Sequence, residues 1–225
     1  MRPIAHRGFS RIAPENTLAA FACALAAGFS SLHTDVRLSA DGELVLYSPR
    51  VTPEGHPVAA LSRSELSLSA GYLVPTLVEA LDAFPDAFWN IEIKTPSAAP
   101  FFMELAQNMS LDSGKILLSS FRHEIIVQVA ELLNIECGLL AAHRPPALNT
   151  LLYAAMPHPR LRTLIWHYEA LDITLLEQAN ALGFHNWAYG AETDYEHQLC
   201  QEFGIQGIIT DYPEFFGLSV SSGLQ

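Results

Sequence analysis

The sequence predicts a single-domain α/β protein, a (β/α)8 barrel of the TIM type, over residues 1–218, with residues 219–225 as a flexible tail. Three observations predict this fold. Short apolar segments alternate with helical patterns along the whole chain, which is the element order of a parallel barrel. The length of 225 residues fits one such barrel. Half of the residues are hydrophobic and 16% are charged, as expected for a sheet covered on both faces.

The predicted strands are eight apolar runs rich in β-branched and aliphatic residues. They are Pro3–His6, Ser31–Arg37, Phe88–Ile93, Ile116–Ser119, Ile135–Leu140, Leu161–Trp166, Phe184–Ala188 and Gln206–Thr210. An open doubly wound sheet is the competing architecture. The sequence has neither a dinucleotide-binding glycine loop after the first strand nor a Walker A loop, so the barrel is favoured.

Local signals place several helix ends. Thr76 and Glu79 form a capping box that begins a helix, and Pro85 ends it. Gly28 lies where the first helix should stop. Leu44–Tyr47, followed by several prolines and glycines, predicts a β extension and then a short irregular excursion over the barrel mouth after the second strand.

Composition limits the partners. The formal net charge is 12 − 24 = −12, and an acidic surface disfavours nucleic acid and anionic membranes. The most apolar stretch, Leu18–Phe29, is too short to span a bilayer, so no stable membrane insertion is expected. Cys23, Cys137 and Cys200 are far apart and predict reduced thiols in a cytoplasmic protein without a secretion leader. The oligomeric state is left open.

Charged side chains gather at the predicted strand ends, which meet at one mouth of a barrel. His6 and Arg7 end the first strand. Side chains alternate along a strand, so His33 and Asp35 share one face of the second strand, and Glu92 and Lys94 share one face of the third. Buried carboxylates need cationic partners, so the pattern predicts a site for a divalent cation.

These residues also carry a family resemblance. His6-Arg7-Gly8, the Pro14-Glu15-Asn16-Thr17 segment and Asp35–Gly42 resemble the opening of the glycerophosphodiester phosphodiesterase family. The similarity continues to the end of the chain, through Val74–Leu77, Asn90–Lys94, Ser119–Phe121, Trp187 and Gly207–Pro213.

The resemblance implies a barrel enzyme of glycerol and lipid metabolism that cleaves glycerophosphodiesters to an alcohol and glycerol 3-phosphate. It implies a divalent metal, calcium or magnesium, held by carboxylates. By position, the implied catalytic residues are His6, Arg7 and Lys94. Asp35, Glu92 and His33 are the implied metal ligands, and Arg7, Glu15, Phe121 and Trp187 are expected at the substrate.

The sequence departs from the family pattern at two positions. His33 stands where the family has a glutamate, which weakens the expected binding of calcium or magnesium and better suits zinc, manganese or iron(II). Ser48 stands where the family has its second acid/base histidine, and a serine does not titrate near neutral pH.

Three hypotheses stay open. The chain could be a metal-dependent phosphodiester hydrolase, slow or altered in substrate, or a degenerate barrel that binds a phosphate-containing ligand without turnover. The third is a related reaction that leaves a cyclic phosphate.

Overall fold

A computed structural model describes residues 1–109, 111, 114–153 and 155–218, and the predicted tail 219–225 lies outside this range. Eight parallel strands form a closed barrel, because β1 hydrogen-bonds to β9 on one side and to β2 on the other. The predicted (β/α)8 barrel is therefore confirmed. The eight strands are β1 (Arg2–Ala5), β2 (Ser31–Leu38), β4 (Phe88–Ile93), β5 (Ile116–Ser120), β6 (Glu136–Ala141), β7 (Leu161–His167), β8 (His185–Tyr189) and β9 (Gly207–Thr210).

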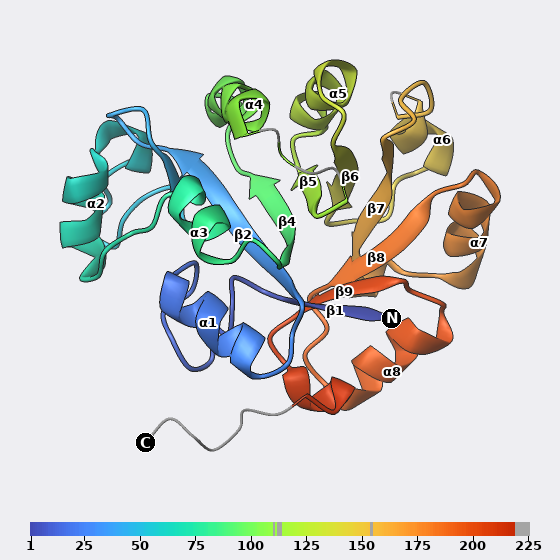
Figure 1. The fold of residues 1–225 in the computed structure, drawn as a ribbon. Coiled ribbons are helices and arrows are strands. Elements are labelled where there is room, and N and C mark those ends of the chain that lie inside the picture. The colour runs from blue at the N-terminus through green and yellow to red at the C-terminus, as the bar shows by residue number, and fades with distance from the viewer. Residues whose placement is uncertain (110, 112–113, 154, 219–225) are drawn as a thin grey trace.

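Helices surround this ring of strands (Figure 1). Thr76 begins α3 with the predicted capping box, its hydroxyl accepting from the Glu79 amide while the Glu79 carboxylate accepts from the Thr76 amide. The α-helices between the barrel strands are α1 (Leu18–Ala26), α3 (Leu77–Ala83), α4 (Ala98–Met109), α5 (His123–Leu132), α6 (Leu148–Leu152), α7 (Ile173–Ala181) and α8 (Asp194–Glu202), and two short 3-10 helices are η2 (Tyr168–Ala170) and η3 (Pro213–Phe216).

The apolar core has two layers. The larger lies between the strands and the surrounding helices. The smaller fills the inside of the barrel. Within it, Trp187 packs against Phe88, the first residue of β4, with 6.1 Å between ring centroids. This contact places Trp187 toward the N-terminal end of β4. The members of the inner cluster are Ile4, Leu117, Leu140, Ile165, Trp187 and Ile209.

The excursion between β2 and β4 is more regular than the sequence predicted. The expected β extension is present as β3 (Leu44–Leu46), which pairs antiparallel with β2. The segment then forms a 3-10 helix, η1 (Val58–Ala60), and the helix α2 (Arg63–Ala70), which a Ser62–Glu65 capping box begins. A small core of its own holds it together, with Val45, Tyr47, Val58, Leu66 and Val74.

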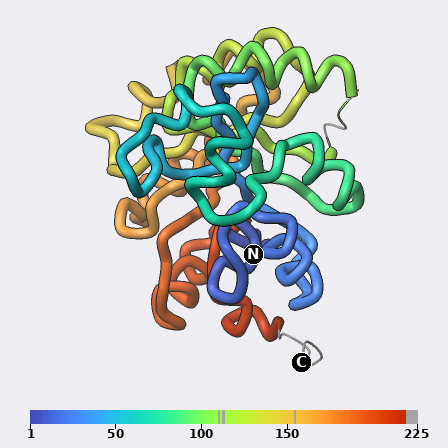
Figure 2. The backbone as a smooth tube through the Cα atoms, turned by 90° about the vertical axis from the view of Figure 1, so that its left-hand side faces the viewer, coloured from blue at the N-terminus to red at the C-terminus, as the bar shows by residue number. Residues whose placement is uncertain are grey.

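The position of the excursion also corrects the prediction. Its first residues border the mouth, because the Tyr47 amide donates to the Asp35 carbonyl of β2. The helix α2, however, lies at the outer edge of the molecule beside β2 and α3 (Figure 1), and faces the viewer in Figure 2. None of the helices in the described ranges is long and apolar enough to cross a membrane.

Candidate active site

Two carboxylates form the base of the polar cluster. The parallel register of β2 and β4 places Asp35 opposite Glu92, and the two side chains are 0% and 5% exposed. Placing two carboxylates so close together out of water requires compensating positive charge.

Two cations supply that charge. Arg7 Nε lies 2.7 Å from Asp35 Oδ2. Lys94 Nζ lies 3.1 Å from Asp35 Oδ1 and donates to Glu92 Oε1 at 2.5 Å. Two negative and two positive side chains therefore balance at the mouth.

The charges shift the pKa values of these groups. Burial alone would raise the pKa of the Asp35 carboxyl, but His33, Arg7 and Lys94 outweigh it and hold that pKa well below its usual range. Burial alone would lower the pKa of Lys94, but Asp35 and Glu92 raise it above its ordinary value. The Asp35 carboxylate and the Lys94 ammonium are therefore both charged at neutral pH.

A strained loop after β1 positions Arg7. Arg7 and Asn16 both have left-handed backbone conformations, with φ of 57° and 58°. The Asn16 amide donates to the Arg7 carbonyl at 2.9 Å, and Arg7 Nη1 donates to Glu15 Oε2 at 2.8 Å. The loop therefore directs the guanidinium inward, between Glu15 and Asp35.

Asn16 is a positioning residue to which the sequence analysis gave no role. Its side chain is 1% exposed. Asn16 Oδ1 accepts from the Asp35 amide at 3.0 Å and from the Thr34 hydroxyl at 2.9 Å, and Nδ2 donates to Asp35 Oδ2 at 3.3 Å. The signal was present, because asparagine tolerates left-handed backbone and bonds to nearby backbone groups.

His6 has an acidic partner that sequence analysis also left without a role. Its Nδ1 lies 3.0 Å from Oδ2 of Asp211, the residue after β9, and Ser10 donates to Asp211 Oδ1 at 2.7 Å. Burial would raise the pKa of Asp211, but the contacts with His6 and Ser10 lower it. Asp211 directly follows β9, the strand that pairs with β1. Its position at a strand end could therefore have indicated a role at the mouth.

His33 completes a group of three side chains that could hold a metal ion. It is 2% exposed, and burial lowers the pKa of its imidazole, which favours the neutral form that binds metals. Its Nε2 lies 3.6 Å from Glu92 Oε2, and its buried Nδ1 has no hydrogen-bond partner within the described residues. One ligand atom each from His33, Asp35 and Glu92 lie within 4.8 Å of one another. This donor set fits a divalent cation.

Two aromatic residues border the charged cluster, and a third does not. Phe121 is 43% exposed, its ring centre lies 6.0 Å from Lys94 Nζ, and it contacts Tyr189 edge-on at 5.8 Å. Tyr189 was not singled out in the sequence, although it ends β8. Trp187, expected at the substrate, lies instead in the apolar interior of the barrel, because it is two residues further from the mouth than Tyr189.

Ser48, which stands where the family has its second histidine, lies beside Arg37. Ser48 is half-buried, and its carbonyl accepts from Arg37 Nε at 2.9 Å and from Arg37 Nη2 at 2.7 Å. Arg37 follows Asp35 by two residues on β2, so both side chains lie on the same face. Burial, and then the charge of Arg50, lower the pKa of Arg37 against the opposing effect of the mouth carboxylates.

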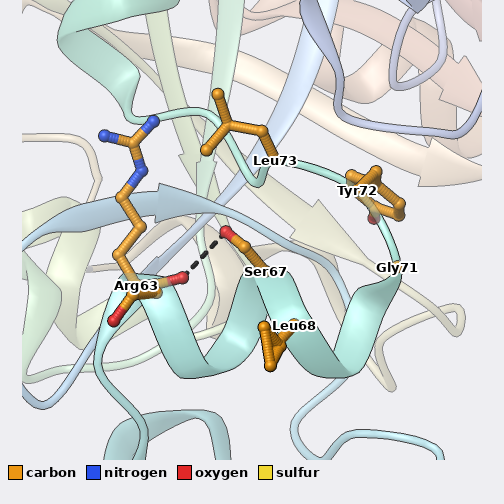
Figure 3. Close-up of a pocket in the computed structure, with 7 residues that line it drawn as sticks. Arg63, Ser67, Leu68, Gly71, Tyr72 and Leu73 are labelled. Atoms are coloured by element: carbon orange, nitrogen blue, oxygen red, sulfur yellow. Dashed lines mark hydrogen bonds between the residues drawn. The ribbon is translucent and has the colours of Figure 1, made fainter.

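A separate hollow of about 650 Å³ lies beside α2 (Figure 3). The exposed side chains of Leu68 and Leu73 border it, and the Ser67 hydroxyl donates to the Arg63 carbonyl. Arg63 is itself paired with Glu79. The Arg63 guanidinium and the Ser67 hydroxyl are thus already bonded within the protein, so this hollow is not the candidate catalytic site.

Fold and mouth together define a (β/α)8-barrel protein with a cluster of charged side chains at the C-terminal ends of its strands. The model of the glycerophosphoryl diester phosphodiesterase family matches residues 6–215, and the chain belongs to that family. The chain is 27% identical to a glycerophosphodiester phosphodiesterase of Caldanaerobacter subterraneus, over 94% of each chain.

Solved structures of phosphodiesterases are similar to this chain over nearly its whole length. The crystal structure of a glycerophosphodiester phosphodiesterase from Thermotoga maritima has a TM-score of 0.82 at 25% identity and covers 96% of each chain. A phosphodiesterase from Oleispira antarctica, solved with its product sn-glycerol-3-phosphate, has a TM-score of 0.83 at 24% identity, over 95% of this chain and 94% of that one. This last likeness is one of fold.

Proposed function

We propose that this protein hydrolyses glycerophosphodiesters to an alcohol and glycerol 3-phosphate at the mouth formed by His6, Arg7, His33, Asp35, Glu92 and Lys94. One observation carries the proposal, namely that Arg7 and Lys94 are both held by Asp35 beside the imidazoles of His6 and His33, whose ring centroids are 5.4 Å apart. Two fixed cations beside an acid/base group meet the needs of a phosphodiester, whose reaction concentrates negative charge on phosphoryl oxygens.

His6 transfers the proton. Asp211 accepts a hydrogen bond from Nδ1 of His6, so the free lone pair that takes up a proton is on Nε2. The aspartate then stabilises the imidazolium that forms. Ser10 holds Asp211 from the other side, which keeps the pair from rotating. Positioned proton transfer of this kind contributes about 10²–10⁴-fold to a rate.

Arg7 and Lys94 bind and orient the phosphoryl group. Both cations are already fixed by carboxylates, so little side-chain entropy remains to be lost when an anion arrives. Glu15 holds Arg7 from the outer side of the loop. The exposed ring of Phe121 beside Lys94 provides an apolar wall for the substrate.

A divalent ion fits between His33, Asp35 and Glu92, where it would polarise a phosphoryl oxygen. One imidazole and two carboxylates are ligands that suit manganese or zinc better than calcium. We therefore propose one of these two ions, which His33, Asp35 and Glu92 would hold.

The test is release of glycerol 3-phosphate from glycerophosphocholine and glycerophosphoglycerol, with calcium, magnesium, manganese and zinc in turn. His6→Ala should lower kcat by about 10²–10⁴-fold. His185→Ala is the matched control, because His185 is exposed at the start of β8, the far end of the barrel. Product release at the same rate from the His6 variant would refute the proposed role.

The same assay separates the two other hypotheses. Binding of the diester without any product supports the degenerate barrel, and phosphorus NMR would detect a cyclic phosphate. A cytoplasmic location remains part of the proposal, supported by the three cysteines, all of which are free thiols. The released glycerol 3-phosphate places the reaction in glycerol and lipid metabolism.

A further inference from the structure

His197 is a buried histidine outside the charged cluster at the mouth. It lies on α8 and is 3% exposed. Its imidazole contacts three aromatic rings at the end of the chain, with centroid distances of 5.9 Å to Tyr212, 4.8 Å to Phe215 and 5.8 Å to Phe216. These rings keep the imidazole from turning out to solvent. A buried imidazole needs a hydrogen-bond partner for each nitrogen, so its two partners indicate its role.

The hydrogen bonds of His197 determine which ring nitrogen carries the hydrogen. Nδ1 lies 2.7 Å from the Thr193 carbonyl oxygen, which can only accept, so Nδ1 carries a hydrogen. Nε2 lies 2.8 Å from the Thr210 hydroxyl. In the neutral ring, Nε2 has a lone pair and accepts from that hydroxyl. His197 is therefore the acceptor toward which Thr210 donates.

Thr210 connects this acceptor to the acid/base pair at the mouth. Its hydroxyl oxygen accepts from the Tyr212 amide at 3.0 Å, and its carbonyl accepts from the His6 amide at 3.0 Å. A threonine hydroxyl bonded to the amide two residues later fixes a tight turn. Asp211 is the residue inside that turn. The turn therefore sets the direction of the carboxylate that lies 3.0 Å from Nδ1 of His6.

We infer that His197 is a positioning residue for the pair of His6 and Asp211, acting through the hydroxyl of Thr210. Thr210 is 2% exposed, so its hydroxyl cannot turn to water when the imidazole is missing, and the side chain must change rotamer to find another acceptor. The new rotamer releases the Tyr212 amide and opens the turn that directs the carboxylate.

The effect on rate rests on the proposed function, in which His6 transfers the proton from Nε2. Without the carboxylate at Nδ1, the ring is free to rotate or to move its hydrogen to Nε2, and the lone pair needed at the mouth is lost. Within the described ranges, the hydrogen bonds and ring contacts of His197 reach neither Arg7 nor Lys94. Loss of His197 should therefore slow proton transfer and leave phosphate binding intact.

The first experiment measures the tautomer of His6 without any turnover. Nitrogen-15 NMR of the imidazoles reports which ring nitrogen carries the hydrogen, and the His6→Ala variant assigns the signal by its absence. His197→Leu keeps an apolar side chain among the aromatic rings and removes the acceptor. The His6 signal should change from the form with hydrogen on Nδ1 to a mixture of both tautomers. His197→Gln places an amide oxygen near the position of Nε2 and should restore the wild-type signal.

The second experiment separates kcat from KM with glycerophosphocholine as substrate. In His197→Leu, kcat should fall about tenfold to 10²-fold, as expected for a displaced acid/base group, while KM changes little. His197→Gln should recover most of the rate. Thr210→Val removes the same hydrogen bond from the other side. The double variant His197→Leu with Thr210→Val should therefore lose no more than the larger single loss, whereas independent effects would multiply.

Asn186→Leu is the control for a merely structural effect. Asn186 is 1% exposed on the neighbouring strand β8, and its Oδ1 accepts from the Trp166 indole at 2.9 Å. This variant removes an equally buried hydrogen-bonding side chain. Urea denaturation should show a stability loss comparable to that of His197→Leu, while kcat and the His6 signal stay as in wild type.

The outcomes distinguish the positioning role from the reaction. An unchanged His6 signal in folded His197→Leu would overturn the positioning role, and Thr210→Val provides the same test if the leucine variant does not fold. The same tautomer change in Asn186→Leu would overturn it as well, because it would indicate general loosening of the barrel. A tautomer change confined to the His197 and Thr210 variants, without product release from any form including wild type, would support the positioning role and refute the hydrolase.

Discussion

The side chain of Asn16 offers a sharp test of how the mouth is held together. It bridges the loop that carries Arg7 to the strand that carries Asp35, through three hydrogen bonds and a left-handed backbone. Asn16→Gly removes the side chain and keeps the backbone conformation accessible. Asn16→Ala removes the side-chain bonds and adds strain, because alanine disfavours positive φ.

The expected magnitude follows from these contacts. Removing Asn16 Oδ1 leaves the buried Asp35 amide without its acceptor, which costs about 1–3 kcal/mol. Loss of the bond to the Asp35 carboxylate adds about 1 kcal/mol, and the Thr34 hydroxyl can rotate to another partner. Asn16→Gly should therefore lower the free energy of unfolding by about 2–4 kcal/mol. Asn16→Ala should lower it by up to about 1 kcal/mol more.

Urea denaturation of the purified variants would measure these differences, with Asn149→Ala as a control. Asn149 is exposed on α6 and should change stability by less than about 0.5 kcal/mol. Both Asn16 variants should also lose activity, because Asp35 loses the group that orients it. A change below about 0.5 kcal/mol for Asn16→Gly would show that the network does not stabilise the mouth, contrary to our reasoning.

Three further predictions concern the metal ligands, the acid stability and the barrel interior. His33→Glu adds a hard carboxylate to the group of three, so calorimetry should show calcium binding about tenfold or more tighter, and unchanged affinity would argue against metal at this position. The pKa of Asp211 is lowered, so its stabilising effect is present above about pH 4 and is lost as the pH falls through the folded-state value. The difference in unfolding free energy between wild type and Asp211→Asn should therefore shrink from pH 6 to pH 3, and a constant difference would contradict this. Gly207→Ala places a Cβ 2.7 Å from the Trp187 ring, and urea denaturation should show a loss of about 1–3 kcal/mol, whereas wild-type stability would mean that the ring moves freely.

Much of the fold was predictable because it depends on local pattern. The alternation of apolar strands and helices identified the barrel, and the Thr76–Glu79 capping box identified the start of α3. The capping box of α2 was equally local but lay in a stretch that prolines and glycines made look irregular. The alternation of side chains along β8 could not show which of Trp187 and Tyr189 borders the mouth. Both lie on the same face of the strand, and they differ only in their distance from its C-terminal end.

The sequence by itself determined the barrel, the family and the set of charged residues at the strand ends, because strand periodicity and motif order are properties of neighbours in the chain. Only the tertiary structure decided which side chains contact each other. The pairing of His6 with Asp211, 205 residues away, depends on the closure of β1 against β9. Contacts between distant residues are set by how the strands close into a ring, which no local pattern encodes.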